Sequence, residues 1–151
     1  MSGFSRLVLD TNVWLDWLVF ADPSTTMLDT AYRTGSVYLL TDEACRDEWR
    51  RVLAYPAIAA RIDRSVHDRI VANGPESPRT VCAELTLPFT ELPRCQDPDD
   101  QKFIALAARE NADCLITRDK YLLAVRPQRF GLRFRIMTLH AWNAAIGSSA
   151  K

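Results

Sequence analysis

Four short stretches of this sequence carry carboxylates at positions where they could bind a cation: LVLDTN at 7–12, CRDEW at 45–49, QDPDD at 96–100 and LITRDK at 115–120. Three lie where an apolar strand gives way to a turn or where a helix starts, and the fourth places Glu48 within an apolar helical stripe. Two carboxylates about 4 Å apart repel by roughly 4 kcal/mol at an effective dielectric of 20. A cluster of them therefore takes up protons or binds a divalent cation. Oxygen ligands favour Mg²⁺ or Mn²⁺ over zinc.

The predicted helix over 43–54 turns one acid inward. At about 100° per residue, Glu48 falls on the apolar side with Cys45 and Trp49, whereas Glu43 and Asp47 project to the opposite side. An inward carboxylate must be paired, protonated or bound to a metal ion. Glu48 is therefore a candidate ligand.

A second helix, predicted over 98–110, begins with another inward acid. Asp100 opens an apolar stripe that continues through Phe103, Ile104 and Ala107. The same wheel predicts that three polar residues point away from this stripe: Gln101, Lys102 and Arg109. Asp97 precedes Pro98, a pair typical of a helix N-terminus, so it is interpreted first as a cap and second as a metal or water ligand.

Two further acids follow apolar strands. Asp10 ends the strand at 7–9 and Asp119 follows the strand at 115–117. In an open parallel sheet, ligands bind at the carboxyl ends of strands near a switch in strand order. Thr117 could orient a carboxylate through its hydroxyl. The alternatives are that Asp10 or Asn12 merely caps the next helix and that Asp119 caps the turn after it.

The elements that position these acids alternate between strand and helix. The runs at 7–9 and 114–116 are apolar without alternation, which is typical of strands buried on both faces of a parallel sheet. Weaker strands are predicted at 37–40 and 134–137, and helices at 13–20, 25–33, 43–54 and 98–110. This order predicts a three-layer α/β/α sandwich around a mainly parallel sheet of four or five strands.

The 151 residues are expected to form one domain spanning 1–151. Residues 57–94 read as a less regular helical or loop insertion, with one helix predicted near 65–72. A closing helix starts after Thr138, and 147–151 is predicted to be a frayed tail.

Composition leaves the partner open, because nineteen basic residues balance nineteen acidic ones. The four cysteines lack C-x-x-C spacing and are expected to be reduced, with Cys45 and Cys114 buried. His67 and His140 are expected at the surface. The longest apolar run is too short to span a bilayer and no signal pattern opens the chain, so a cytoplasmic protein without membrane contact is expected.

With DTN after the first strand, an inward glutamate, DPDDQKFIALA and LITRD in this order, the chain resembles the PIN-domain nucleases. It is most similar to the subgroup that forms the toxins of bacterial toxin–antitoxin pairs. The resemblance implies four acidic catalytic and metal ligands, Asp10, Glu48, Asp100 and Asp119, and three supporting residues, Asn12, Thr117 and Asp97. The family often has a further acid or Asn where this chain has Gln101.

The resemblance further implies Mg²⁺- or Mn²⁺-dependent hydrolysis of phosphodiester bonds in single-stranded or structured RNA, with a cognate antitoxin as partner and a possible homodimer. Three tryptophans could serve such an interface but are more simply interpreted as core: Trp14, Trp17 and Trp142.

Four alternatives stay open at the level of sequence. One is a catalytically silent PIN-like scaffold that binds RNA or protein. Another is a magnesium-dependent phosphatase that forms an aspartyl phosphate, although its D-x-D pattern would need an acid where Asn12 stands. A receiver domain shares the acid cluster, but its paired acids follow the first strand. In the last alternative every acid is a cap or a surface charge.

Overall fold

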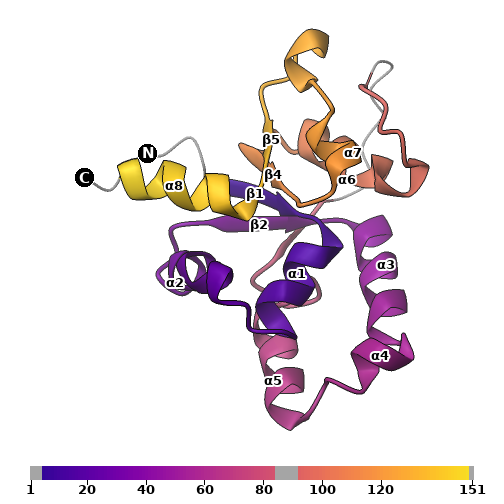
Figure 1. Cartoon of the computed structure of the whole chain (residues 1–151), viewed down its shortest axis with the longest axis vertical. Helices are drawn as coiled ribbons and strands as arrows, with labels where there is room; N and C mark the ends of the chain where they lie inside the picture. Colours follow the sequence, from indigo (N-terminus) through magenta and orange to yellow (C-terminus); the bar gives the residue numbers. More distant parts are fainter. Residues whose placement is uncertain (1–4, 84–91, 150–151) are drawn as a thin grey trace.

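A single parallel sheet organises the chain (Figure 1). The computed structural model describes residues 5–83 and 92–149. Within them the strand order is β3-β2-β1-β4-β5, and all four neighbouring pairs are parallel. The strands are β1 (Arg6–Leu9), β2 (Tyr38–Thr41), β3 (Val81–Cys82), β4 (Cys114–Ile116) and β5 (Arg135–Met137). The predicted sheet is confirmed, with β3 as a strand that the sequence analysis did not include.

The predicted helices are all present, and two short helices, at 56–59 and 120–123, were not predicted. They are α1 (Thr11–Leu18), α2 (Thr26–Arg33), α3 (Glu43–Leu53), α4 (Pro56–Ala59), α5 (Arg64–Asn73), α6 (Gln101–Arg109), α7 (Lys120–Leu123) and α8 (Leu139–Ser149). Short 3-10 turns are η1 (Pro23–Thr25), η2 (Pro98–Asp100) and η3 (Pro127–Phe130). The helix α8 continues through 147–149, which the sequence analysis assigned to a frayed tail. Residues 150–151 of that tail lie outside the described residues.

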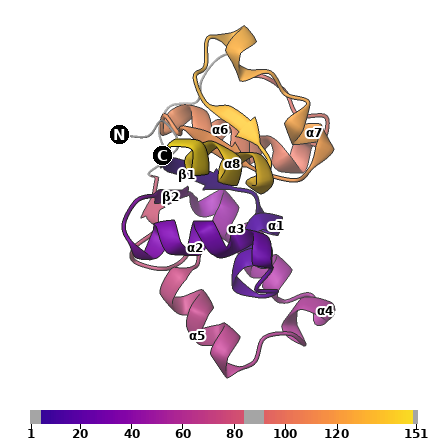
Figure 2. The same cartoon turned by 60° about the vertical axis from the view of Figure 1, so that its left-hand side comes forward.

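Helices cover both faces of the sheet, as the unalternating apolar strands predict. Leu7 and Leu9 of β1 pack in one core cluster that includes side chains of α1, α2, α5 and α8. Val8 faces the opposite way, into a cluster built largely from α6 and the α7 region. Figure 2 shows α6 and α7 on one side of the strands and α2 and α5 on the other. The predicted three-layer α/β/α sandwich is therefore confirmed.

The tryptophans belong to this core. Trp14, Trp17 and Trp142 are all buried, as their interpretation as core residues requires. Trp14 stacks on Trp17 with ring centroids 5.7 Å apart and contacts Trp49 of α3 at 6.3 Å. Burial of side chains this large contributes several kcal/mol each, so this aromatic cluster holds α3 against α1.

The segment at 57–94 is more regular than the predicted insertion. It contains α5, whose Val66 is buried in the core, and β3, which pairs with β2 at Leu40–Val81 and Thr41–Cys82. Both residues of β3 are exposed, so the strand shows no pattern of burial in the sequence. Residues 84–91 of this segment lie outside the described residues.

The central strands place the candidate site. The chain leaves β1 for β2 on one side, while β4 pairs with β1 on the other, so the strand order reverses at β1. Leu9 of β1 is in register with Ile116 of β4. Asp10 extends this pairing, because its amide donates to the Ile116 carbonyl at 3.0 Å. The carboxyl ends of β1 and β4 therefore meet at the kind of switch point where open α/β sheets bind ligands.

The remaining expectations about thiols, histidines and membrane contact can be compared with the structure. All four cysteines are free; Cys45, Cys95 and Cys114 are buried, and Cys82 is exposed. Burial raises the pKa of the Cys114 thiol to about 12. Both histidines are exposed, as expected. Among the helices of the described residues, none has the length and apolar character needed to cross a bilayer.

Candidate metal centre

Asp10 lies where β1 ends and α1 begins, with only 4% of its surface exposed. Its Oδ2 accepts a hydrogen bond from the Thr117 hydroxyl at 2.7 Å, and its Oδ1 accepts from the Asn12 amide at 3.1 Å. Burial raises the pKa of Asp10, these two hydrogen bonds lower it, and the charges of Glu48 and Asp119 raise it further. Asp10 is therefore the N-cap of α1 and a member of the acid cluster at once.

Asn12 plays a smaller part than the sequence suggested. Its side chain is exposed, and the structure shows its contact with Asp10 through the backbone amide. The alternative in which Asn12 caps α1 is wrong, because Asp10 occupies the N-cap position.

Thr117 connects the two strand ends. It is fully buried just after β4, and its hydroxyl donates to Asp10 while accepting from the Asp119 amide at 2.9 Å. Asp119 in turn caps α7, since its Oδ1 accepts from the Tyr121 amide at 2.7 Å. A single threonine thus ties Asp10 and the backbone of Asp119 into one network at the edge of the sheet.

The DPDD segment supplies the most perturbed carboxyl. Asp97 caps η2 by accepting from the Asp99 amide at 3.0 Å, as its pairing with Pro98 predicts. Asp100 is half-buried at the start of α6. Burial, followed by the charges of four other acids, raises the pKa of Asp100 to about 7: Asp10, Asp119, Asp97 and Glu48. The predicted acids therefore act on one another across four separate parts of the chain.

Glu48 points inward from α3, and both of its oxygens have partners. The Thr11 hydroxyl donates to Oε2. The Lys102 ammonium lies 2.6 Å from Oε1, with 16% of the lysine side chain and 19% of the glutamate side chain exposed. The prediction that Lys102 points away from the core is wrong, because α3 packs beside α6 and covers the face on which Lys102 lies.

The same packing explains two other misplaced side chains. Arg109 was predicted to point away, but its Nη2 lies 2.7 Å from Oδ2 of Asp42, the N-cap of α3. Gln101 was also predicted to face outward. Instead its half-buried amide accepts from the Cys95 amide and donates to the Pro93 carbonyl, both at 2.9 Å. A helical wheel of α6 alone cannot predict these contacts, because the partners lie at α3 and in the segment 93–95.

The donors at this edge fit a hard divalent cation by their chemistry. They are carboxylates, and burial followed by the charges of the other acids raises the pKa of Asp100. Among the described residues, however, no three acidic, histidine or cysteine side chains already form a group that could hold an ion. Glu48 is engaged by Thr11 and Lys102, and Asp119 by the amide of Tyr121. To bind an ion, Glu48 would have to release one of its present partners, because both of its oxygens are engaged.

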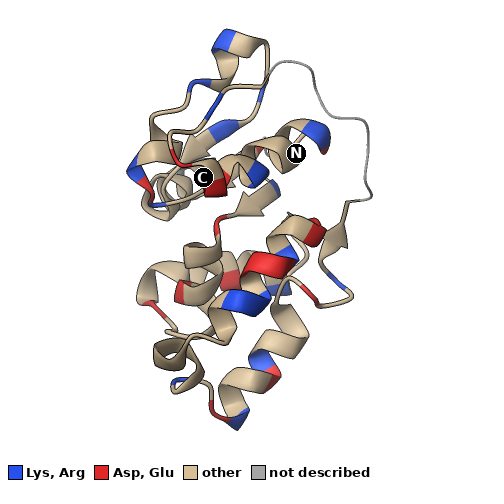
Figure 3. Ribbon diagram, turned by 90° about the vertical axis from the view of Figure 1, so that its right-hand side faces the viewer, with Lys and Arg blue, Asp and Glu red and all other residues tan. Residues whose placement is uncertain are grey.

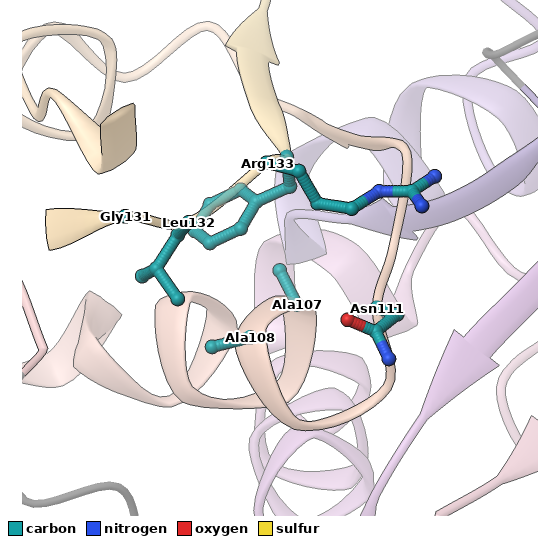
Figure 4. Close-up of a pocket in the computed structure, with 7 residues that line it drawn as sticks. Ala107, Ala108, Asn111, Gly131, Leu132 and Arg133 are labelled. Carbon is teal, nitrogen blue, oxygen red and sulfur yellow. The ribbon is translucent and has the colours of Figure 1, made fainter.

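Two cavities bordered by described residues lie away from these acids. One of about 330 Å³ opens between the last turn of α6 and residues 131–134, and is lined by Ala107, Ala108, Asn111, Gly131, Leu132, Arg133 and Phe134. Figure 4 shows Arg133 and Asn111 at its side. Another, of about 310 Å³, borders Trp17 and Asp29. None of the four predicted ligands lines either cavity.

Charges of both signs are interspersed over the elements, as the balanced composition predicts (Figure 3). Several acids are engaged locally: Arg118 pairs with Asp16 at 3.1 Å, and Arg50 pairs with Asp47 at 2.9 Å. Asp100 differs from such pairs in that its pKa is raised to about 7, with the charges of four other acids among the causes.

Two residues of this site, Thr11 and Lys102, were not predicted from the sequence. Both adjoin predicted ligands, since Thr11 follows Asp10 and Lys102 lies two positions after Asp100. That adjacency is the signal that could have drawn attention to them. Their partner, however, is on α3, and the contact depends on how α3 packs.

Comparison with known families agrees with the motifs. A family model described as PIN domain matches residues 6–121, a span that contains Asp10, Glu48, Asp100 and Asp119. Searches of curated proteins and of solved structures give no significant match.

Proposed function

The chain belongs to the PIN-domain family, and on this basis we propose that it is a Mg²⁺- or Mn²⁺-dependent endoribonuclease, the toxin of a toxin–antitoxin pair. The PIN fold is a nuclease-type fold that usually works with divalent metal ions. The observation that carries the proposal is the network of Asp10, Thr117 and Asp119 at the carboxyl ends of β1 and β4, with Asp100 near enough for the charges of Asp10 and Asp119 to raise its pKa.

The proposed ligands divide by their present contacts. Asp10 and Asp100 would be the principal ligands, because Thr117 holds Asp10 in place and because burial and the charges of the other acids raise the pKa of Asp100. Glu48 and Asp119 would complete the site. Asp97 would act mainly by shaping the turn that presents Asp100.

The chain's own groups would do the rest of the chemistry. When bound, the ion would supply a Lewis acid that lowers the pKa of water and neutralises charge on the phosphate. Thr117 holds Asp10 in one orientation, since its hydroxyl donates to Oδ2. Glu48 or Asp119 could accept the proton of the attacking water, because each is a carboxylate at the edge of the cluster. We propose no serine, cysteine or histidine nucleophile.

RNA as substrate and an antitoxin as partner are parts of the same proposal. The Lys102–Glu48 contact supports the second part, because it demonstrates that an ammonium group can sit on one of these acids. An antitoxin could place its own Lys or Arg there and block the site. Co-purification with the product of the neighbouring reading frame would test this. Failure of the two proteins to bind would rule out the antitoxin part of the proposal. A homodimer and a cytoplasmic location are likewise proposals.

The enzymatic proposal is tested by cleavage of a mixed-sequence single-stranded RNA in Mn²⁺ or Mg²⁺, with chelator and Asp10→Asn as controls. We expect products from the wild type with metal and none from either control. The same oligonucleotide made as DNA distinguishes a ribonuclease from a general nuclease. RNA binding without any metal-dependent product would instead identify a silent scaffold.

A further inference from the structure

Lys102 is in an unusual place for a lysine. Its ammonium contacts Oε1 of Glu48 at 2.6 Å and also the carbonyl of Asp99. With 16% of its side chain exposed, it lies where solvent meets the acid cluster. The sequence places it on α6 two residues after Asp100. A cation belonging to the chain therefore already neutralises one of the proposed ligands.

The two partners of Glu48 differ in how easily they can leave. Thr11 is buried and has a short, β-branched side chain, so its hydroxyl has little freedom to move away. Lys102 has a flexible four-carbon stem and a strongly hydrated ammonium group. Release of Lys102 into water is therefore the easier way to free an oxygen of Glu48.

A second ion pair would keep α3 in place if the first one opened. Lys102 and Arg109 are seven residues apart and share a face of α6, and both contact acids at α3. Arg109 pairs with Asp42, whose other oxygen caps α3 through the Cys45 amide at 2.9 Å. The link between Arg109 and Asp42 involves neither Lys102 nor Glu48, so it can stay closed when the contact between those two residues opens.

We propose that Lys102 is an exchangeable counter-ion of the site: its ammonium group holds Glu48 in the metal-free protein and is displaced when a divalent cation binds that carboxylate. The inference rests on the metal dependence of the proposed function and adds a positioning residue to it. At equal distance a doubly charged ion attracts a carboxylate twice as strongly as an ammonium group does. The exchange breaks one ion pair and forms another, with no covalent step.

The exchange can be observed directly in the wild-type protein. The chain contains three lysines, Lys102, Lys120 and Lys151, so selective ¹³C labelling of lysine side chains gives a simple spectrum. Lys120→Arg and Lys151→Arg variants assign the signals without touching Lys102. On titration with diamagnetic Mg²⁺, we expect the Lys102 signal to move toward the position of a solvated lysine. Persistence of this signal at its metal-free position at saturating Mg²⁺ would overturn the proposal.

A binding measurement tests the energetic side. Lys102→Met removes the competing cation, so Mn²⁺ should bind roughly tenfold more tightly than it does to the control, given the strength of a charged hydrogen bond. The matched control is Lys120→Met, which removes an exposed positive charge directly after Asp119. Calorimetric titration gives both constants. If Lys102→Met does not fold, Lys102→Gln takes its place.

The outcomes separate this inference from the proposed function. Equal Mn²⁺ affinities for the Lys102→Met and Lys120→Met variants, with the wild type binding normally, would overturn the exchange and leave the metal-dependent nuclease standing. Absence of Mn²⁺ binding by all three proteins would overturn both. Tighter Mn²⁺ binding by Lys102→Met, together with a wild-type Lys102 signal that shifts on addition of Mg²⁺, would support both the inference and the metal site.

Discussion

Replacing Asp100 by Asn should stabilise the metal-free protein, because this carboxyl is held where it resists ionisation. Burial and then the charges of Asp10, Asp119, Asp97 and Glu48 raise its pKa from 3.8 to about 7. Asparagine has nearly the same shape and carries no charge at any pH. The substitution therefore removes the repulsion while leaving the start of α6 filled.

The magnitude follows from linkage. A difference of about three pKa units between the folded and unfolded states corresponds to roughly 4 kcal/mol. Asp100 is only half-buried, so screening by solvent reduces the expected gain to about 1–2 kcal/mol. For a chain of this size, that gain raises the melting temperature by roughly 4 °C.

The dependence on pH provides the sharper test. Between about pH 4 and pH 7 the folded protein holds a proton on Asp100 that the unfolded chain has lost, so wild-type stability falls as pH rises through this window. The gain from Asp100→Asn should be full at pH 8, smaller at pH 5, and smallest near pH 4.

Thermal melts of metal-free protein at pH 8 and pH 5 measure the effect. The control is Asp99→Asn, which removes the neighbouring exposed acid and should cost a few tenths of a kcal/mol through the helix dipole. Equal effects of the two substitutions, or a gain from Asp100→Asn that is the same at both pH values, would refute the reasoning.

Three further substitutions test other parts of the site. Asp10→Asn should keep its capping contact with the Asn12 amide and a melting temperature near that of the wild type while losing metal-dependent cleavage; a fall of many degrees would make Asp10 a structural cap. Thr117→Val should lower the free energy of unfolding, measured by chemical denaturation, by about 1–3 kcal/mol, because Asp10 loses the hydroxyl that donates to it. Thr117→Ser keeps a hydroxyl and should recover most of that loss. Arg109→Met should cost about 3 kcal/mol by leaving Asp42 unpaired. Adding Asp42→Asn should restore much of that loss, and a double variant no more stable than the single one would contradict the pairing.

Much of this architecture could be predicted from local patterns. The runs at 7–9 and 114–116 are apolar at every position because both faces of β1 and β4 are covered, and Asp10 and Asp119 follow them directly. Asp97 before Pro98 indicated a helix start, and the structure has one there.

Capping and ligand roles were treated as alternatives for Asp10 and Asp119, yet both residues cap a helix and also belong to the acid cluster. A carboxylate has two oxygens, so one can accept from a backbone amide while the other faces the site. The sequence pattern for a cap therefore does not argue against a second role.

Contacts between helices could not be predicted in this way. The helical wheel correctly predicted that Phe103 and Ile104 lie in the core, but it wrongly predicted that Lys102 and Arg109 point into solvent. Their partners, Glu48 and Asp42, come from a helix about sixty residues earlier in the chain. The orientation of a long cationic side chain depends on such partners, and a helical wheel of a single helix does not include them.

The strand β3 was missed for a similar reason. Its two residues, Val81 and Cys82, are both exposed at the edge of the sheet. They join it through backbone pairing with β2, which requires no particular side-chain pattern.

The central claim is that these acids bind a divalent cation. Crystals of the protein soaked in Mn²⁺ would test it most directly, through the anomalous scattering of the metal. A strong anomalous peak between the carboxylates of Asp10 and Asp100 is the predicted result, with the same peak absent from Asp100→Asn crystals. A saturating Mn²⁺ soak that leaves the space between Asp10 and Asp100 without a peak would contradict it.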